Sequence, residues 1–107
     1  IAVLDALTHR IQIFDVEGGF VRSFGSRGEG PGQFLNPLSA AVGAGGEIIV
    51  ADRNRKDVQV FSKEGELLQI IGKGGDSDVK FRQVSNVATD ASGRLFVLND
   101  NSVVMLC

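Results

Sequence analysis

The chain repeats itself at an interval of 47 residues, and this periodicity restricts its possible folds more than any other feature of the sequence. When residues 1–53 are aligned with residues 48–100 without a gap, at least thirteen positions are identical. Typical amino-acid frequencies give roughly three or four such identities by chance. Similar residues, such as Ile13 and Val60, occupy further aligned positions. A period of this length indicates stacked supersecondary units of one kind.

Within one period, the sequence reads as four short strands separated by turns. Residues 58–61 alternate between apolar and polar positions with the period of two that a strand shows. No segment carries the apolar stripe of a helix of ten or more residues. Four strands in about 47 residues match a β-propeller blade, so the sequence predicts an all-β protein of antiparallel four-stranded blades. The strands expected in the middle period are Ser39–Val42, Ile48–Ala51, Val58–Phe61 and Leu67–Ile71.

The middle period also resembles an NHL repeat. The family pattern has a glycine-rich turn ending in Gly-Gln-Phe, a proline, an apolar strand with an Ala-Asp turn, and an Ile-Gln-Val-Phe strand. The matching segments here are residues 28–34 (GEGPGQF), Pro37, residues 48–52 (IIVAD) and residues 58–61 (VQVF). The resemblance implies a propeller of a kind that typically closes with six blades.

On this interpretation the chain is an incomplete NHL-type β-propeller of about two to three blades. We expect a partial blade at residues 1–36, a complete blade at residues 37–83 and a partial blade at residues 84–107. A blade buries its faces only against neighbouring blades, so adjoining blades of the same propeller are expected to be required for closure. The start at Ile1 rather than Met suggests a fragment of a longer protein.

The composition excludes several kinds of site. One cysteine, Cys107, and one histidine, His9, cannot form an intramolecular disulfide, a zinc cluster or a histidine-rich metal centre. We therefore predict no catalytic residue, no cofactor and no metal. No apolar run approaches the ~18 residues of a membrane helix and no signal peptide is visible, so we predict no membrane partner and a cytoplasmic location. The formal net charge of −2 excludes a chain that is basic throughout but allows a local basic patch.

The expected meander places the long, charged loops at one end of the blades, because alternate turns of an antiparallel sheet emerge at opposite ends. The glycine-rich connections 25–34 and 72–81 share this end with the turns 5–10 and 52–57. Loops of this kind often carry function. The candidate face for RNA or a protein partner consists of six basic residues at this end: Arg53, Arg55, Lys56, His9, Arg10 and Arg27.

Three interpretations of this face stay open, namely RNA contact, protein contact and a solvated polar rim. The resemblance supports RNA, because some tripartite-motif NHL proteins bind RNA on one propeller face. The chain has no Tyr or Trp on which bases can stack, which argues against RNA. Acidic residues are expected at the same end and also argue against it: Asp52, Asp57, Glu29, Asp76 and Asp78.

Other motifs have simpler structural explanations. Residues 76–78 (Asp-Ser-Asp) resemble the start of a calcium loop but lack the downstream Gly and Glu of an EF-hand, so a polar turn is predicted. Asp5 and Asp52 recur at one position of the period and are predicted to cap turns. Gly18 and Gly65 recur after an acidic residue and are predicted to occupy left-handed turn positions in hairpins.

The predicted core consists of strand residues and of two phenylalanines that follow the long loops. Phe34 and Phe81 are expected to plug the gap between adjacent blades at the loop end. The full set predicted to be buried is Val3, Ile13, Phe14, Phe24, Phe34, Val50, Val60, Phe61, Ile71, Phe81 and Val97.

These observations predict a non-catalytic platform for protein or RNA binding. The resemblance is closest to the NHL domains of tripartite-motif proteins and implies a multidomain regulator or ubiquitin ligase whose RING domain lies elsewhere. One alternative is a fragment of a propeller enzyme resembling the peptide-amidating lyase, whose metal chemistry needs histidines near the axis. A bacterial NHL protein of unknown role is a further alternative.

Overall fold

The computed structural model describes residues 2–5, 7–72, 84–99 and 102–106. These residues form ten β-strands and no helix, as the sequence predicts. The strands are β1 (Ala2–Asp5), β2 (Arg10–Phe14), β3 (Phe20–Phe24), β4 (Pro37–Val42), β5 (Ile48–Asp52), β6 (Asp57–Phe61), β7 (Leu67–Gly72), β8 (Val84–Thr89), β9 (Leu95–Asn99) and β10 (Ser102–Leu106).

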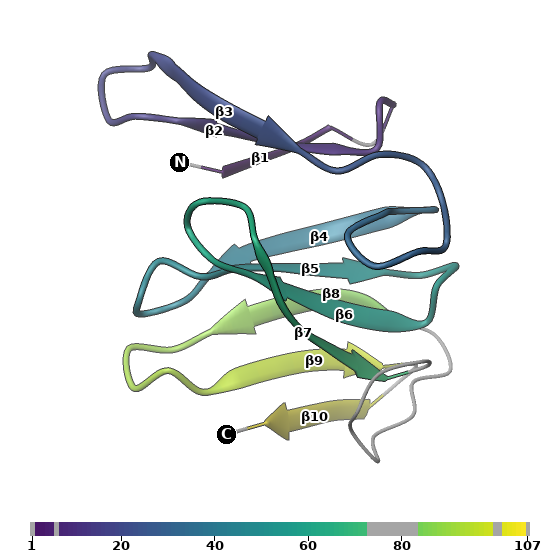
Figure 1. Cartoon of the computed structure of the whole chain (residues 1–107). Helices are drawn as coiled ribbons and strands as arrows, with labels where there is room; N and C mark the ends of the chain where they lie inside the picture. The colour runs from purple at the N-terminus through teal and green to yellow at the C-terminus, as the bar shows by residue number, and fades with distance from the viewer. Residues whose placement is uncertain (1, 6, 73–83, 100–101, 107) are drawn as a thin grey trace.

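The strands form three antiparallel sheets that follow one another along the chain (Figure 1). The first sheet has the order β1-β2-β3, the middle sheet β4-β5-β6-β7 and the third sheet β10-β9-β8. Strand β4 packs against β1 of the first sheet on one side and against β8 of the third on the other. The arrangement is an incomplete propeller, because every sheet is a meander and the stack is not closed.

The 47-residue period is visible in the backbone. Strands β4 and β5 begin 47 residues before β8 and β9. The register irregularity between Pro37 and Ser39 recurs between Val84 and Asn86. One difference lies between β9 and β10, where Asn99 pairs with Ser102, whereas Asp52 pairs with Asp57 in the middle sheet. The third sheet therefore turns with two residues fewer than the middle sheet.

Four tight hairpins of one geometry lie at the left-hand end of the sheets in Figure 1. In the β6–β7 hairpin, the N–H of Ser62 donates to the carbonyl of Glu66 at 2.7 Å, and the N–H of Gly65 donates to the carbonyl of Ser62 at 2.9 Å. Gly65 and its equivalent Gly18 have φ of +93° and +89°, as predicted for left-handed turn positions that favour glycine. The four turns span residues 15–19, 43–47, 62–66 and 90–94.

Two apolar clusters hold the sheets together. Phe34, which lies in the β3–β4 connection, is fully buried between the first and middle sheets. The Phe61 ring lies 4.8 Å from that of Phe24 and 5.8 Å from that of Phe34, measured between centroids. The cluster between the middle and third sheets consists of Ile49, Ala51, Val58, Ile71, Val84, Val87, Leu95 and Val97.

Five of the eleven residues predicted to form the core are buried, and the prediction is wrong for one of the eleven. Val3 is 45% exposed, because it points to the side of the first sheet that has no neighbouring sheet. Phe81 lies outside the described residues. The prediction is confirmed for Phe34, Val50, Phe61, Ile71 and Val97, whereas Ile13, Phe14, Phe24 and Val60 are half-buried.

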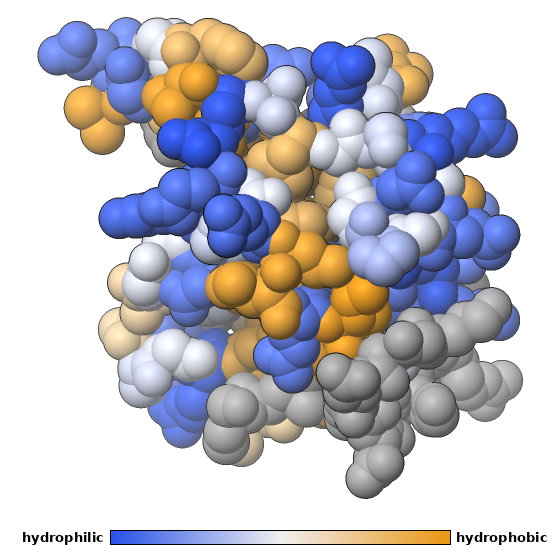
Figure 2. Space-filling view, viewed as in Figure 1, coloured by the Kyte–Doolittle hydropathy of each residue, from blue (hydrophilic) through white to orange (hydrophobic). Residues whose placement is uncertain are grey.

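The surface separates by polarity. In the space-filling view, hydrophilic side chains gather at both ends of the sheets, and an apolar area lies near the centre where β7 crosses the molecule (Figure 2). Leu68 of β7 is 57% exposed. On the face shown, hydrophilic side chains are therefore concentrated at the two loop ends.

Candidate interaction face

The β1–β2 turn, the β3–β4 connection and the β5–β6 turn all lie at the right-hand end of the sheets in Figure 1, opposite the four tight hairpins. We call this end the loop face. The meander predicted from sequence is thus correct, and it brings the loops that carry all six candidate basic residues to one end.

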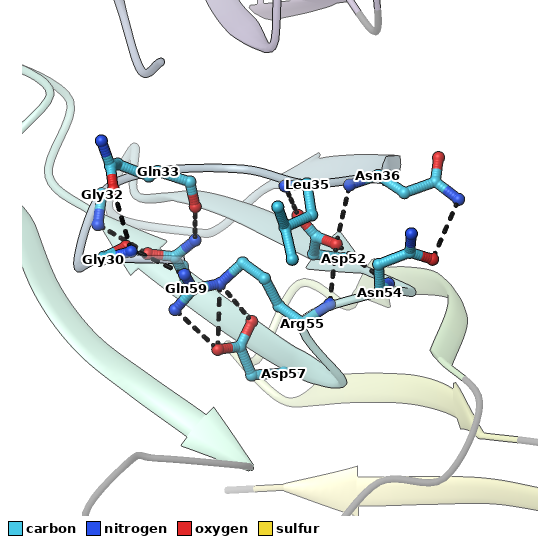
Figure 3. A network of polar contacts seen from close by, with 10 residues as sticks. All are labelled: Gly30, Gly32, Gln33, Leu35, Asn36, Asp52, Asn54, Arg55, Asp57 and Gln59. Carbon is cyan, nitrogen blue, oxygen red and sulfur yellow. Dashed lines mark hydrogen bonds and ion pairs between the residues drawn. The ribbon is translucent and has the colours of Figure 1, made fainter. Parts of the chain in front are cut away.

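A buried carboxylate organises the loop face. Asp52 is fully buried and accepts four backbone hydrogen bonds (Figure 3). Its Oδ2 accepts from the N–H of Leu35 at 2.8 Å, and its Oδ1 accepts from the N–H of Asn36 at 3.0 Å. Oδ1 also accepts from the N–H groups of Asn54 and Arg55, both at 3.1 Å. The carboxylate therefore caps its own turn, as predicted, and also binds the preceding connection, which the sequence did not predict.

Asp5, the equivalent of Asp52 in the first sheet, caps the β1–β2 turn. Its Oδ1 accepts from the N–H groups of Leu7 and Thr8 at 3.2 and 3.3 Å. Its Oδ2 accepts from Gln12 Nε2 at 3.2 Å. The hydrogen bonds from Thr8, with smaller ones from Leu7 and Gln12, hold the pKa of the Asp5 carboxyl below its ordinary value. The predicted capping role is confirmed.

Arg55 does not occupy the solvated position expected of it. Its side chain is 7% exposed, and its Nη2 lies 2.8 Å from Oδ2 of Asp57. Its Nε lies 3.1 Å from both oxygens of that carboxylate. Its Nη1 donates to the carbonyl of Gly30 at 2.9 Å. All three guanidinium nitrogens are therefore engaged inside the protein, and Arg55 holds the β3–β4 connection against the β5–β6 turn.

A glutamine pair completes this internal network. Gln59 is fully buried, its Nε2 donates to the carbonyl of Gln33, and its Oε1 accepts from the N–H of Gly32, both at 2.8 Å. The Oε1 of Gln33 accepts from the N–H of Gly30 at 2.9 Å. Sequence reasoning missed this pair, although the recurrence of Gln59 as Gln12 in the period was a usable signal.

The remaining basic side chains of the loop face point to solvent. Arg10, Arg27, Arg53 and Lys56 are exposed, and within the described residues none of them forms an ion pair. His9 is half-buried, and its Nδ1 is buried without a hydrogen-bond partner among those residues. His9 and Lys56 are 47 residues apart and both have left-handed backbones, with φ of +57° and +62°.

The carboxylates at this end are distributed differently from the cations. Asp52 and Asp57 are buried and bound by backbone N–H groups and by Arg55. Glu29 is exposed, while Asp76 and Asp78 lie outside the described residues. Two of the acidic residues expected to neutralise the basic patch, Asp52 and Asp57, are therefore buried beneath its surface.

The described residues contain no group of three or more His, Cys, Asp or Glu side chains placed to hold a metal ion. In the same part of the chain there is no helix able to span a lipid bilayer.

The family model of the NHL repeat matches residues 34–61, which run from the buried Phe34 through β4 and β5 to the end of β6. This chain contains an NHL repeat. The matched segment includes the carboxylate of Asp52, the Arg55–Asp57 pair and Gln59, so most of the internal network of the loop face lies within the NHL repeat.

Two known proteins resemble this chain. "Protein brain tumor" of Drosophila melanogaster is 47% identical over 55 residues, which are 50% of this chain and 5% of that protein. The match thus spans a small part of the relative's length. The crystal structure of the WD40 β-propeller domain of Doa1 aligns with a TM-score of 0.63 at 19% identity, covering 91% of this chain and 29% of that one. This second likeness shows the propeller fold.

Proposed function

We propose that this NHL segment is a non-catalytic interaction platform whose loop face binds the phosphate backbone of RNA. The observation that carries the proposal is that basic side chains at that face are exposed, whereas two of its carboxylates are buried. Arg10, Arg27, Arg53 and Lys56 are exposed, while Asp52 and Asp57 are buried and already bound. Exposed cations on a rigid loop end attract a polyanion, and a large part of nucleic-acid affinity comes from such contacts.

The chemistry of the face favours phosphates over bases. Base recognition in single strands relies largely on stacking against aromatic side chains or Arg, and the chain has no Tyr or Trp. Phe34 and Phe61, the aromatic residues nearest the network, are buried. We therefore expect binding that depends strongly on salt and weakly on RNA sequence.

Arg55 has a positioning role in this proposal. Its guanidinium is bound to Asp57 and Gly30, and its side chain is only 7% exposed, so it is not presented to a phosphate in solvent. It instead fixes the turn that presents Arg53 and Lys56 to solvent. The residues expected to contact RNA are thus Arg53 and Lys56, with Arg10 and Arg27 beside them on the loop face.

The wider context is also a proposal. A multidomain regulator of the tripartite-motif type, cytoplasmic and carrying a ubiquitin-ligase domain elsewhere, is consistent with the NHL family, and a protein ligand is the alternative to RNA. The NHL-repeat match over residues 34–61 and the match to "Protein brain tumor" support a binding module rather than an enzyme.

The test is a titration of the chain against a fluorescently labelled oligouridine at two salt concentrations. Replacing Arg53 and Lys56 together with alanine should weaken binding and reduce the slope of log K against log salt by about 1.4, because each lost phosphate contact on a single strand removes about 0.7. Lys56→Ala alone should reduce the slope by about 0.7, and Lys63→Ala is its control, because Lys63 is also exposed but lies in the hairpin turn at the opposite end.

Equal affinity and equal salt slope for the wild type and the double variant would refute the RNA role of this turn. A loss in Lys63→Ala as large as that in Lys56→Ala would also refute it, because binding would then follow net charge rather than the loop face.

A further inference from the structure

Two asparagine side chains meet at the loop face. Asn36 lies in the β3–β4 connection and Asn54 lies in the β5–β6 turn, and Nδ2 of Asn36 donates to Oδ1 of Asn54 at 3.5 Å (Figure 3). This distance is at the long limit of a hydrogen bond, so the contact is weak. Asn54 is exposed and Asn36 is half-buried. A ligand in solvent can therefore reach the pair and replace its mutual hydrogen bond.

Each amide keeps one hydrogen-bonding group that has no partner among the described residues. Asn36 retains its Oδ1 acceptor, and Asn54 retains its Nδ2 donor. If both amides rotate by 180°, one donor and one acceptor are again left over. The pair therefore matches a ligand group that both donates and accepts a hydrogen bond.

The fold does not require an amide at position 54. The equivalent residue of the first sheet, 47 positions earlier, is Leu7. The N–H of Leu7 donates to Oδ1 of Asp5 at 3.2 Å, just as the N–H of Asn54 donates to Oδ1 of Asp52 at 3.1 Å. Leu7 is 94% exposed, so its side chain contributes little to that turn. The turn forms with either side chain, which leaves the Asn54 amide available to a ligand.

The β3–β4 connection is also held to the β5–β6 turn without the side-chain contact. The N–H of Asn36 donates to Oδ1 of Asp52 at 3.0 Å. The N–H of Arg53 donates to the carbonyl of Asn36 at 3.1 Å. Neither bond involves an amide side chain. The fold therefore positions the amide pair but does not depend on it.

The amide pair lies beside two of the cations assigned above to phosphate binding. Arg53 directly precedes Asn54, Lys56 follows two positions later, and both are exposed. Each ribose of an RNA strand joins two successive phosphates, so a strand that contacts these cations brings a ribose to the turn. Phosphate oxygens only accept hydrogen bonds, whereas the ribose 2′-hydroxyl both donates and accepts. The 2′-hydroxyl, which is the same in every nucleotide, is therefore the group of the RNA backbone that the pair matches.

We propose that Asn36 and Asn54 bind a ribose 2′-hydroxyl, so that the loop face distinguishes RNA from DNA. The hydroxyl donates to Oδ1 of Asn36 and accepts from Nδ2 of Asn54. Arg53 and Lys56 supply affinity for phosphates, which RNA and DNA share, whereas the amide pair selects the sugar. This inference rests on the proposed binding of RNA by the loop face.

The experiment compares the affinity of the whole chain for labelled oligouridine and oligodeoxyuridine of equal length, which carry the same base. Wild type should bind oligouridine about fivefold more tightly, the net effect of one hydrogen bond that water can replace. A third strand, 2′-O-methyl oligouridine, keeps the sugar conformation of RNA but lacks the hydroxyl donor. It should bind as weakly as the deoxy strand.

Asn54→Leu is the main variant, because the chain itself carries leucine at the equivalent position. It should bind oligouridine and oligodeoxyuridine with equal affinity and keep the wild-type salt slope, since no phosphate contact is lost. Asn36→Ala should also remove the preference, because it deletes the acceptor. Leu7→Ala is the control, since it changes an exposed side chain of the neighbouring turn, and it should keep the wild-type preference.

Three results would overturn this inference while leaving the phosphate contacts in place. They are equal affinity of wild type for the ribose and deoxyribose strands, an unchanged preference in Asn54→Leu, and tight binding of the 2′-O-methyl strand, which would assign the preference to sugar conformation. Failure of the proposed function gives a different result. The double variant of Arg53→Ala and Lys56→Ala would then bind oligouridine as tightly as wild type, which would overturn both proposals.

Discussion

Arg55 and Asp57 form a buried ion pair across the β5–β6 turn, with Nη2 and Oδ2 2.8 Å apart and both side chains almost completely excluded from solvent. Removing two charges from water costs several kcal/mol per ion unless geometry and further hydrogen bonds compensate. Here the remaining Nη1 donates to the carbonyl of Gly30, which joins the turn to the β3–β4 connection. The pair therefore fixes the shape of the loop face.

Arg55→Ala should destabilise the fold by about 3–5 kcal/mol, because it leaves the Asp57 carboxylate buried without its main partner. Arg53→Ala, which removes a neighbouring exposed side chain, should change the free energy of unfolding by less than about 0.5 kcal/mol. Urea denaturation measures both values. Similar losses for the two variants would contradict the buried role of Arg55.

Asp52→Ala should loosen the β3–β4 connection, because four backbone N–H groups lose their common acceptor. We expect a loss of about 3 kcal/mol, since unsatisfied buried donors cost about 1–3 kcal/mol each and some will find water. Hydrogen exchange should accelerate at the amides of Leu35 and Asn36. Asp5→Ala is the comparison and should leave those two amides protected; if they exchange as slowly in Asp52→Ala as in wild type, the carboxylate does not hold the connection.

The fold could be predicted from sequence because its constraints are local and recur. The period-two alternation of the strands and the hairpin glycines, such as Gly18 and Gly65, each depend on a few adjacent residues. The 47-residue interval shows that these local patterns recur along the chain. Asp5 and Asp52 were placed correctly as turn caps for the same reason. The family pattern around residues 34–61 added the identity of the repeat.

The contacts between segments could not be predicted from the sequence. Three closely spaced cations in one turn look equivalent in a sequence, yet Arg55 is buried while Arg53 and Lys56 are exposed. The difference arises because the fold places the Asp57 carboxylate and the Gly30 carbonyl within hydrogen-bond distance of the Arg55 guanidinium. Val3 was misplaced for a related reason, because burial of a strand residue in a blade depends on whether a neighbouring sheet covers that side.

Phe61→Ala should cost about 3–5 kcal/mol, because the ring fills the space between the first and middle sheets and the cavity would collapse only in part. Its ring contacts with Phe24 and Phe34 make this site a junction of both sheets and the β3–β4 connection. Phe20→Ala, at a 61% exposed position, should cost less than about 1 kcal/mol. A loss below 1 kcal/mol for Phe61→Ala in urea denaturation would show that this ring does not hold the sheets together.

The β8–β9 hairpin should weaken in acid. The N–H of Arg94, followed by its guanidinium, holds the pKa of the Asp90 carboxyl below its ordinary value of 3.8. A lowered pKa means that the folded chain favours the ionised form, so the stabilisation is fully present above about pH 5 and is lost as the pH falls through the lowered pKa. The Tm difference between wild type and Asp90→Asn should therefore shrink from pH 7 toward pH 2. A constant difference across this range would contradict ionisation as its cause.

Glu29→Lys should strengthen RNA binding if the loop face contacts phosphates. Glu29 is the exposed carboxylate of the β3–β4 connection, and it opposes a polyanion at the face where Arg27, Arg53 and Lys56 are exposed. Replacing it with lysine removes this repulsion and adds a phosphate contact, so affinity for oligouridine should rise several-fold and the salt slope should steepen by about 0.7. Glu64→Lys makes the same charge change at an exposed turn on the opposite end. Equal gains from both variants would show that the ligand responds to net charge, whereas a gain confined to Glu29→Lys would locate the contact at the loop face.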